Sequence, residues 1–294
     1  MPRLLAIVLL LMGVASAQDV FVGGRVDLEA VVDRGVEARF GRDCGVDATF
    51  SKPKLLDAYF DFSLAGQRPR VQEFYLRLPQ TRRVVDVTLG RFLLPHADAR
   101  TTVVDRYVAG APDLFDTYHG FRRGNVLLDT DVLGLRLSRA WGPLALDLVG
   151  AQAADSGNAC LAARVVASGA RWRGGGSYYL GRDAFGAPLW QAVGHAGWRG
   201  AGCELLGQAF WGGDRGDHRG WTWRASFQPR RSHYDFLAAQ TAFDPPGGRL
   251  LTTTRLGVRR RFAQFYRVEL RGELHDARRP AGTEAVVLRL SAVF

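Results

Sequence analysis

The sequence predicts an all-β protein whose fold class is a closed antiparallel transmembrane β-barrel of sixteen strands. Polar and apolar residues alternate with period two over segments of about ten residues, as in strands that separate two environments. The connections between these segments alternate between short and long. After residue 18 the chain has no uncharged apolar run of the roughly 18 residues that a membrane helix requires. Strands are therefore favoured as the membrane-crossing elements.

The first element is an export signal. Arg3 is followed by an apolar run over residues 4–14 and by Ala-Ser-Ala at 15–17, the small-residue pattern of signal-peptide cleavage. We therefore expect a signal peptide over residues 1–17, cleavage near Ala17, and a barrel domain over residues 18–294. A buried N-terminal helix is the alternative interpretation of the apolar run.

Charge and cysteine content bear on the class of partner. The formal net charge of +10 would suit nucleic acid, but the chain has neither a basic helix nor an aromatic–basic RNA motif. We therefore expect no nucleic-acid partner. Cys44, Cys160 and Cys203 lack metal-ligand spacing, and their odd number leaves no complete disulfide framework. We expect no metal and no cofactor.

The strand segments that follow carry one charged face and one apolar face. In LDAYFDFSL (56–64), Asp57, Tyr59 and Asp61 share a face whose opposite is apolar, whereas Gln240 in segment 232–243 falls on the apolar face as an exception. A soluble sandwich and a membrane barrel both explain this alternation. The predicted strands cover residues 23–34, 36–50, 54–65, 71–78, 83–93, 131–140, 143–153, 159–169, 171–181, 189–199, 201–212, 220–228, 232–243, 250–261, 264–275 and 284–294.

Connection length distinguishes the barrel from the sandwich. Tight turns follow the even-numbered strands, at residues 51–54, 79–82, 140–143 and 228–231. Longer polar connections follow the odd-numbered strands, at residues 154–159, 181–188, 212–220 and 276–284. Short periplasmic turns and longer outer loops are typical of outer-membrane barrels, whereas a sandwich has no reason to keep this parity. One misassigned hairpin would change the count to fourteen or eighteen.

The connection over residues 94–130 is exceptionally long and is third among the outer loops. A structureless connection of this length is normally functional. Its charged residues are Asp98, Arg100, Asp105, Arg106, Asp113, Asp116, Arg122 and Arg123.

Alternation also predicts which charges line the lumen. The acidic residues expected there lie on the first strands: Asp27, Glu29, Asp43, Asp47, Asp57 and Asp61. The basic residues expected there lie on the later strands: Arg136, Arg164, Arg173, Arg199, Arg224, Arg255, Arg259, Arg271 and Arg289. Opposed acidic and basic walls would orient dipolar solutes and separate anions from cations. Cross-strand ion pairing of ordinary wall charge is the alternative.

As a whole, the chain resembles a bacterial outer-membrane porin, including the terminal aromatic Phe294. The stretches DAYFDF (57–62) and VDVTLGRFLLP (85–95), followed by a charged loop, are similar to the phosphate-selective porins of the O and P type. Only Lys52 and Lys54 are lysines, so the resemblance does not transfer a lysine ladder.

The resemblance implies a water-filled channel for small hydrophilic solutes and ions, with phosphate as a candidate. The near balance of acidic residues and arginines among the expected lumen positions predicts only a modest anion preference. The resemblance also implies that the 94–130 loop narrows the pore, an outer loop covering the barrel mouth being the alternative. Phe294 would be an assembly signal for the barrel assembly machinery. The expected setting is the bacterial outer membrane, among lipid and lipopolysaccharide, as a homotrimer.

Non-channel barrels are the alternative function. Some outer-membrane barrels are hydrolases with a Ser and a His on the wall, but the six histidines here form no such pattern and no metal set. An adhesin or receptor would use its outer loops, and those other than the third are short. We therefore expect no catalytic residues.

Overall fold

A computed structural model describes residues 19–32, 36–40, 45–52, 55–63, 70–79, 85–95, 131–153, 157–182, 188–213, 217–230, 232–244, 250–262, 266–275 and 284–293. Within these ranges every regular element is a β-strand. The part of the chain that the structure describes contains no helix with the length and hydropathy of a membrane-spanning segment.

The described strands join in one antiparallel sheet. They are β1 (Asp19–Val32), β2 (Val36–Phe40), β3 (Gly45–Lys52), β4 (Leu56–Ser63), β5 (Arg70–Leu78), β6 (Asp86–Leu93), β7 (Asp131–Trp141), β8 (Leu144–Ala153), β9 (Ala159–Ser168), β10 (Trp172–Arg182), β11 (Pro188–Gly200), β12 (Cys203–Gly213), β13 (Asp217–Phe227), β14 (Tyr234–Asp244), β15 (Leu251–Phe262), β16 (Tyr266–His275) and β17 (Glu284–Val293).

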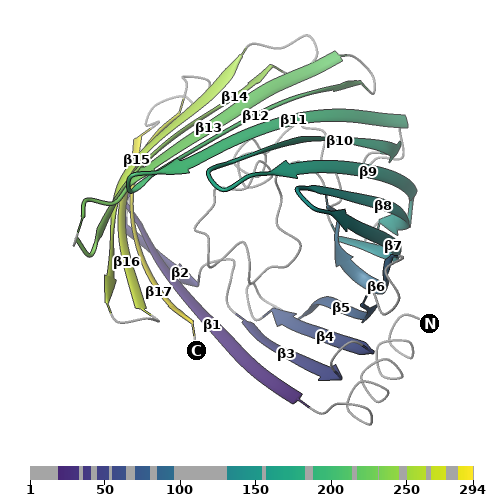
Figure 1. Ribbon diagram of the computed structural model, residues 1–294. Helices are drawn as coiled ribbons and strands as arrows, with labels where there is room; N and C mark the ends of the chain where they lie inside the picture. The colour runs from purple at the N-terminus through teal and green to yellow at the C-terminus, as the bar shows by residue number, and fades with distance from the viewer. Residues whose placement is uncertain are drawn as a thin grey trace.

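From β3 onward each strand pairs with its neighbours in the chain, and the strands follow one another along a strongly curved wall (Figure 1). β1 pairs on one side with β2 and β3 and on the other side with β17. Leu28, for example, lies opposite Phe40 of β2 and opposite Leu290 of β17. Backbone pairing therefore runs from the last strand back to the first.

The expected segments each coincide with one described strand, except 36–50, which is divided into β2 and β3. Between the two pieces the register against β1 shifts, since Phe40 pairs with Leu28 and Gly45 with Arg25. Three steps along β1 thus correspond to five along the partner, a shift of two residues. An even shift keeps the alternation in phase, so both pieces present the same residue parity to each face.

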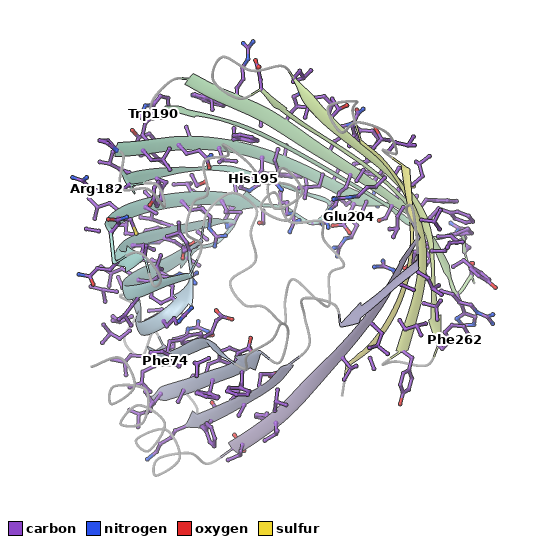
Figure 2. The ribbon with its side chains drawn as sticks, turned by 180° about the vertical axis from the view of Figure 1, so that it is seen from behind. Phe74, Arg182, Trp190, His195, Glu204 and Phe262 are labelled. Carbon is purple, nitrogen blue, oxygen red and sulfur yellow. The ribbon has the colours of Figure 1, made fainter. Side chains whose placement is uncertain are left out.

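The curved sheet has a convex and a concave face, and β8 illustrates the difference. Leu144 and Leu148 are 47% and 46% exposed on the convex face, whereas Asp147 and Val149, on either side of Leu148, are each 4% exposed on the concave face. Trp190 and Phe262 project from the convex side and His195 and Glu204 from the concave side (Figure 2). The buried apolar cluster is contributed by β6–β11 and the residue after β6: Phe92, Leu94, Val132, Val149, Cys160, Ala162, Tyr179 and Leu189.

Tight turns join β7 to β8 and β11 to β12. Ala201 and Gly202 have φ values of 51° and 78°, the left-handed pair of a two-residue hairpin turn. Ser168 donates a backbone hydrogen bond to Pro143, and Gln228 donates one to Gly202, so neighbouring turns lie at one edge of the sheet. We call this edge, which also carries the β9–β10, β13–β14 and β15–β16 connections, the tight-turn edge.

β4 and β6, which contain most of the stretches 57–62 and 85–95, both pair with β5. The rings of Tyr59 in β4 and Tyr75 in β5 lie 5.2 Å apart, and Tyr75 pairs with Gly90 of β6. Gly90 has a φ of 133°, and a Cβ added there would come within 2.3 Å of the Phe74 carbonyl oxygen. Only glycine fits at position 90, because the backbone of β5 approaches β6 this closely there.

Candidate functional site

The candidate site is the concave face of the sheet, where most charged side chains of the described strands lie. Its best-defined cluster surrounds Asp147 of β8. Arg136 of β7 donates to Asp147 Oδ1 from Nε at 2.9 Å and from a terminal nitrogen at 2.7 Å. Arg164 of β9 donates to the other oxygen, Oδ2, at 2.9 and 2.7 Å. Ser138 adds a hydrogen bond to Oδ1 at 2.7 Å.

This cluster joins three strands because the register places its members side by side. Asp147 lies directly opposite Ser138 on β7 and opposite Arg164 on β9. Each arginine holds one carboxylate oxygen through two N–H groups, a geometry that orients both guanidinium planes. Two described arginines thus share one carboxylate.

A second cluster surrounds Glu204 of β12, which points to the concave side (Figure 2). Arg199 of β11 donates to Oε1 at 3.3 Å, and a terminal nitrogen of Arg224 of β13 lies 3.6 Å from the same oxygen. The side chain of Arg199 is 69% exposed and that of Arg224 is 13% exposed. Arg173 lies opposite Gly197 and Ser168, on the same wall. This cluster also has two arginines for one carboxylate.

A third pair, Asp235 of β14 and Arg259 of β15, is almost fully buried. Arg259 Nε and a terminal nitrogen lie 3.1 and 3.0 Å from Asp235 Oδ2. The backbone register continues the row, because Arg259 lies opposite Glu269, and Arg289 lies opposite both Glu269 and Glu29. Positions of opposite charge thus follow one another from β14 to β1.

Two further predicted basic residues have defined register positions. Arg255 of β15 lies opposite Ala239 of β14 and Glu273 of β16. Arg271 of β16 lies opposite Gly257 and Val287.

The acidic residues Asp47, Asp57, Asp61 and Glu73 lie on β3, β4 and β5. Asp47, Asp61 and Glu73 are consecutive cross-strand neighbours on β3, β4 and β5. Asp61 and Glu73 are both completely buried. Asp57 accepts a hydrogen bond from Ser51 at 2.7 Å and lies opposite Arg77, which in turn pairs with Asp86.

Several predicted site residues lie outside the described residues or have only a backbone position. Asp27 pairs with Ser291 of β17 through the backbone. Asp43, Cys44, Phe294 and all the charged residues of the 94–130 loop named above lie outside the described residues. Neither Cys160 nor Cys203 forms a disulfide in the part of the chain that the structure describes.

Asp147, Glu204 and Asp235 are the functional residues that sequence reasoning missed. All three carry the parity of the polar face in their own segments, so alternation indicated their side of the sheet. Their arginine partners come from neighbouring strands, and the register that joins them is not readable from one segment.

Polar side chains without formal charge complete the wall. His195 lies opposite Gln208, and both are more than nine-tenths buried. Among the described residues no group of His, Cys, Asp or Glu could hold a metal ion. The arrangement therefore offers hydrogen-bond donors, acceptors and paired charges along a wall.

The exception on the convex face, Gln240, is satisfied by its neighbours. Its amide oxygen lies 3.4 Å from the indole nitrogen of Trp223, and its amide nitrogen donates to Thr254 at 3.2 Å. The polar group is therefore hydrogen-bonded within the outer surface of the sheet.

No protein-family model matches the chain, and no curated protein matches it either. Similar solved structures include the trimer form of OmpT, an outer membrane protein of Vibrio cholerae, with a TM-score of 0.71 and 13% identity, covering 95% of this chain and 100% of that one. The outer membrane channel DcaP of Acinetobacter baumannii has a TM-score of 0.68 and 10% identity, with 94% and 97% covered. An anion-selective porin from Comamonas acidovorans has a TM-score of 0.66 and 13% identity, with 94% and 99% covered.

These likenesses define the class of fold. The chain has the all-β antiparallel fold of outer-membrane porins and channels over nearly its whole length.

Proposed function

We propose that the chain is an outer-membrane porin, a closed barrel of sixteen strands in which β2 and β3 form one strand. It would carry small hydrophilic solutes and ions by passive diffusion through a water-filled channel. The observation that carries the proposal is the polarity of the curved sheet. Large apolar side chains such as Leu161, Leu256 and Tyr266 are 58%, 59% and 58% exposed on the convex face, opposite a concave face of ion pairs. A bilayer would cover the convex face, and water would fill the concave side.

The pairing of β1 with β17 supports closure of this barrel, because lipid does not tolerate an open sheet edge. The ring of aromatic side chains at the tight-turn edge supports the membrane placement, since barrels carry such girdles at both interfaces. The exposed aromatic residues at this edge are Trp141, Trp172, Trp198, Phe227, Tyr234, Phe262 and Tyr266. We infer that the tight turns face the periplasm.

The wall charges support a modest anion preference. In the Asp147 and Glu204 clusters, two arginines face one carboxylate. The neighbouring acids Asp47, Asp61 and Glu73 oppose that preference from β3–β5. Phosphate is among the anions that we propose pass. Strong discrimination for phosphate over chloride would need a tighter basic cluster than these paired arginines.

The remaining parts of the proposal concern assembly and the pore constriction. The 94–130 loop would narrow the pore, and Phe294 would be recognised by the barrel assembly machinery. The similar OmpT structure is a trimer form, which supports a homotrimer here. The mature chain would begin after Ala17 and lie among lipid and lipopolysaccharide, as a channel and not an enzyme.

Single-channel recording in a planar bilayer tests this function. The purified protein should first be shown to migrate faster unheated than boiled. We then expect discrete conductance steps and a reversal potential that indicates a slightly higher permeability to anions than to cations. Absence of steps, together with hydrolysis of a lipid ester by the same preparation, would replace the channel with a barrel enzyme. Recovery as a soluble periplasmic monomer would contradict the membrane placement itself.

A further inference from the structure

Two arginines on the convex face differ from the arginine clusters of the concave wall. Arg139 of β7 shares its face with Leu135 and Leu137, and Arg260 of β15 shares its face with Leu256 and Phe262. Both arginines lie near the tight-turn edge. Arg139 is two residues before Trp141, the last residue of β7, and Arg260 is two residues before Phe262, the last residue of β15.

Each of these arginines stacks on an aromatic ring of the edge. The Arg139 guanidinium carbon lies 4.7 Å from the centre of the Trp141 ring. That of Arg260 lies 5.2 Å from the Tyr234 ring and 4.5 Å from the Phe262 ring. Stacking occupies the flat face of a guanidinium and leaves the N–H groups at its rim able to donate.

Neither arginine forms an ion pair with a described carboxylate, whereas Arg136, Arg164, Arg199, Arg224 and Arg259 on the concave wall all do. The convex Arg219 of β13, near the opposite edge of the sheet, also has an acidic partner, since its Nε lies 3.0 Å from Asp244 Oδ2. The tight-turn edge therefore presents stacked cations whose counter-charge the described part of the chain does not supply.

We propose that Arg139 and Arg260 bind the phosphate groups of anionic phospholipids in the leaflet that meets the tight-turn edge. A guanidinium fork donates to two phosphate oxygens at once, and the aromatic ring holds it at headgroup depth. An arginine on the lipid face costs about 2–4 kcal/mol at mid-membrane but little at the interface, which suits positions beside the girdle. The inference rests on the membrane placement proposed above, but not on conduction.

The positions of the two arginines favour lipid over a protein partner. β7 and β15 lie on opposite sides of the curved wall (Figure 1). A subunit contact or one protein partner would cover only one side of the wall, whereas lipid contacts every part of the convex face that a subunit contact leaves open. The same chemistry at two distant positions therefore fits a lipid annulus.

Native mass spectrometry of the detergent-solubilised, heat-modifiable protein tests the proposal. The probes are phosphatidylglycerol, phosphatidylcholine and soluble glycerol 3-phosphate. We expect the wild type to retain phosphatidylglycerol in preference to phosphatidylcholine, and Arg139→Gln and Arg260→Gln each to weaken phosphatidylglycerol about five-fold, as for about 1 kcal/mol per basic residue near a membrane surface. Phosphatidylcholine binding should stay unchanged. Arg219→Gln is the matched control and should change neither lipid.

Equal retention of both lipids by the wild type would overturn the proposal, as would an equal loss in Arg219→Gln. Competition by glycerol 3-phosphate at lipid concentrations would show a plain anion site and overturn the lipid assignment. A changed oligomeric state in the glutamine variants would assign these positions to a subunit contact instead. If a glutamine variant does not fold, the wild type in high salt provides the test, because its preference for phosphatidylglycerol should then fall toward parity.

Conductance measurements distinguish a failure of the lipid proposal from a failure of the channel proposal. A wild type that gives no steps but keeps its lipid preference would contradict the channel and leave the lipid site standing. A wild type that gives normal conductance steps but shows no lipid preference would contradict the lipid site and leave the channel standing.

Discussion

Arg164 donates two hydrogen bonds to Asp147 across the β8–β9 pair, and the same carboxylate receives two more from Arg136 across the β7–β8 pair. One carboxylate thus joins three strands and positions two wall arginines. A change at Asp147 would therefore alter both the charge of the concave wall and the contacts that join β7, β8 and β9.

Asp147→Asn should therefore affect both properties. Removing the carboxylate leaves two arginines without their counter-charge, so we expect the anion-to-cation permeability ratio to rise. Loss of one partner from a buried ion pair costs about 3–5 kcal/mol. Because this cluster is largely buried, we expect the free energy of unfolding to fall by an amount approaching that range. Reversal potentials and urea unfolding in micelles measure the two effects. Ser138→Ala, which removes one hydrogen bond and no charge, should cost about 1 kcal/mol and leave selectivity unchanged.

Gly90→Ala should destabilise the sheet where β5 meets β6. A Cβ there overlaps the Phe74 carbonyl oxygen, and the φ of 133° is unfavourable for alanine. We expect a loss of about 2 kcal/mol or more in urea unfolding. Gly194→Ala in β11 is the control, because an added Cβ meets nothing within 4 Å. Equal stability of the two variants would show that β5 and β6 can separate without cost.

Neutralising Arg164, Arg199, Arg224 and Arg255 together should lower the anion-to-cation permeability ratio. Three of these arginines have the carboxylate partners Asp147 and Glu204. Glu204 would lose both of these arginine partners, and Asp147 would keep Arg136. Neutralising Asp27, Asp43 and Asp57 should raise the ratio. Both effects should fade as salt rises, because charges are screened beyond roughly 8 Å at physiological ionic strength. A clearly cation-selective wild type would contradict the proposal of opposed acidic and basic walls. An unchanged permeability ratio at low salt in both sets of variants would contradict it as well.

Deleting residues 99–121 should raise single-channel conductance. The segment is too long and too rich in aromatic residues for a plain connector, and we propose that it narrows the pore. Shortening the 276–284 connection serves as the control and should leave conductance unchanged. An unaltered conductance after the 99–121 deletion would place the loop outside the pore.

Deleting Phe294 should impair assembly in cells without changing the chemistry of the wall. In the sequence the residue follows the alternating segment 284–293, and we propose that it is part of the assembly signal. Surface levels of the truncated chain should fall, whereas refolding of the purified chain into micelles should persist. Normal surface levels would show that the aromatic carries no such signal.

Local sequence determined the all-β class, the strand segments and the face on which each charge lies. Period two is a property of the single strand, so the parity of Asp147 or Arg164 could be read within its own ten-residue segment. The same reading accounted for Asp61 on the polar face and for Leu148 on the apolar face. Over 36–50 the structure describes two pieces, β2 and β3, and the register against β1 shifts between Phe40 and Gly45.

Tertiary structure alone decided which charges meet. Asp147 contacts Arg136 and Arg164 because hydrogen bonding sets the register of β7, β8 and β9, and a slip of one residue would turn its side chain to the other face. Tyr75 meets Gly90, and Arg259 meets Asp235, for the same reason. Alternation is a local property of each strand, whereas register is a relation between strands that pair across the sheet, and only the folded sheet contains it.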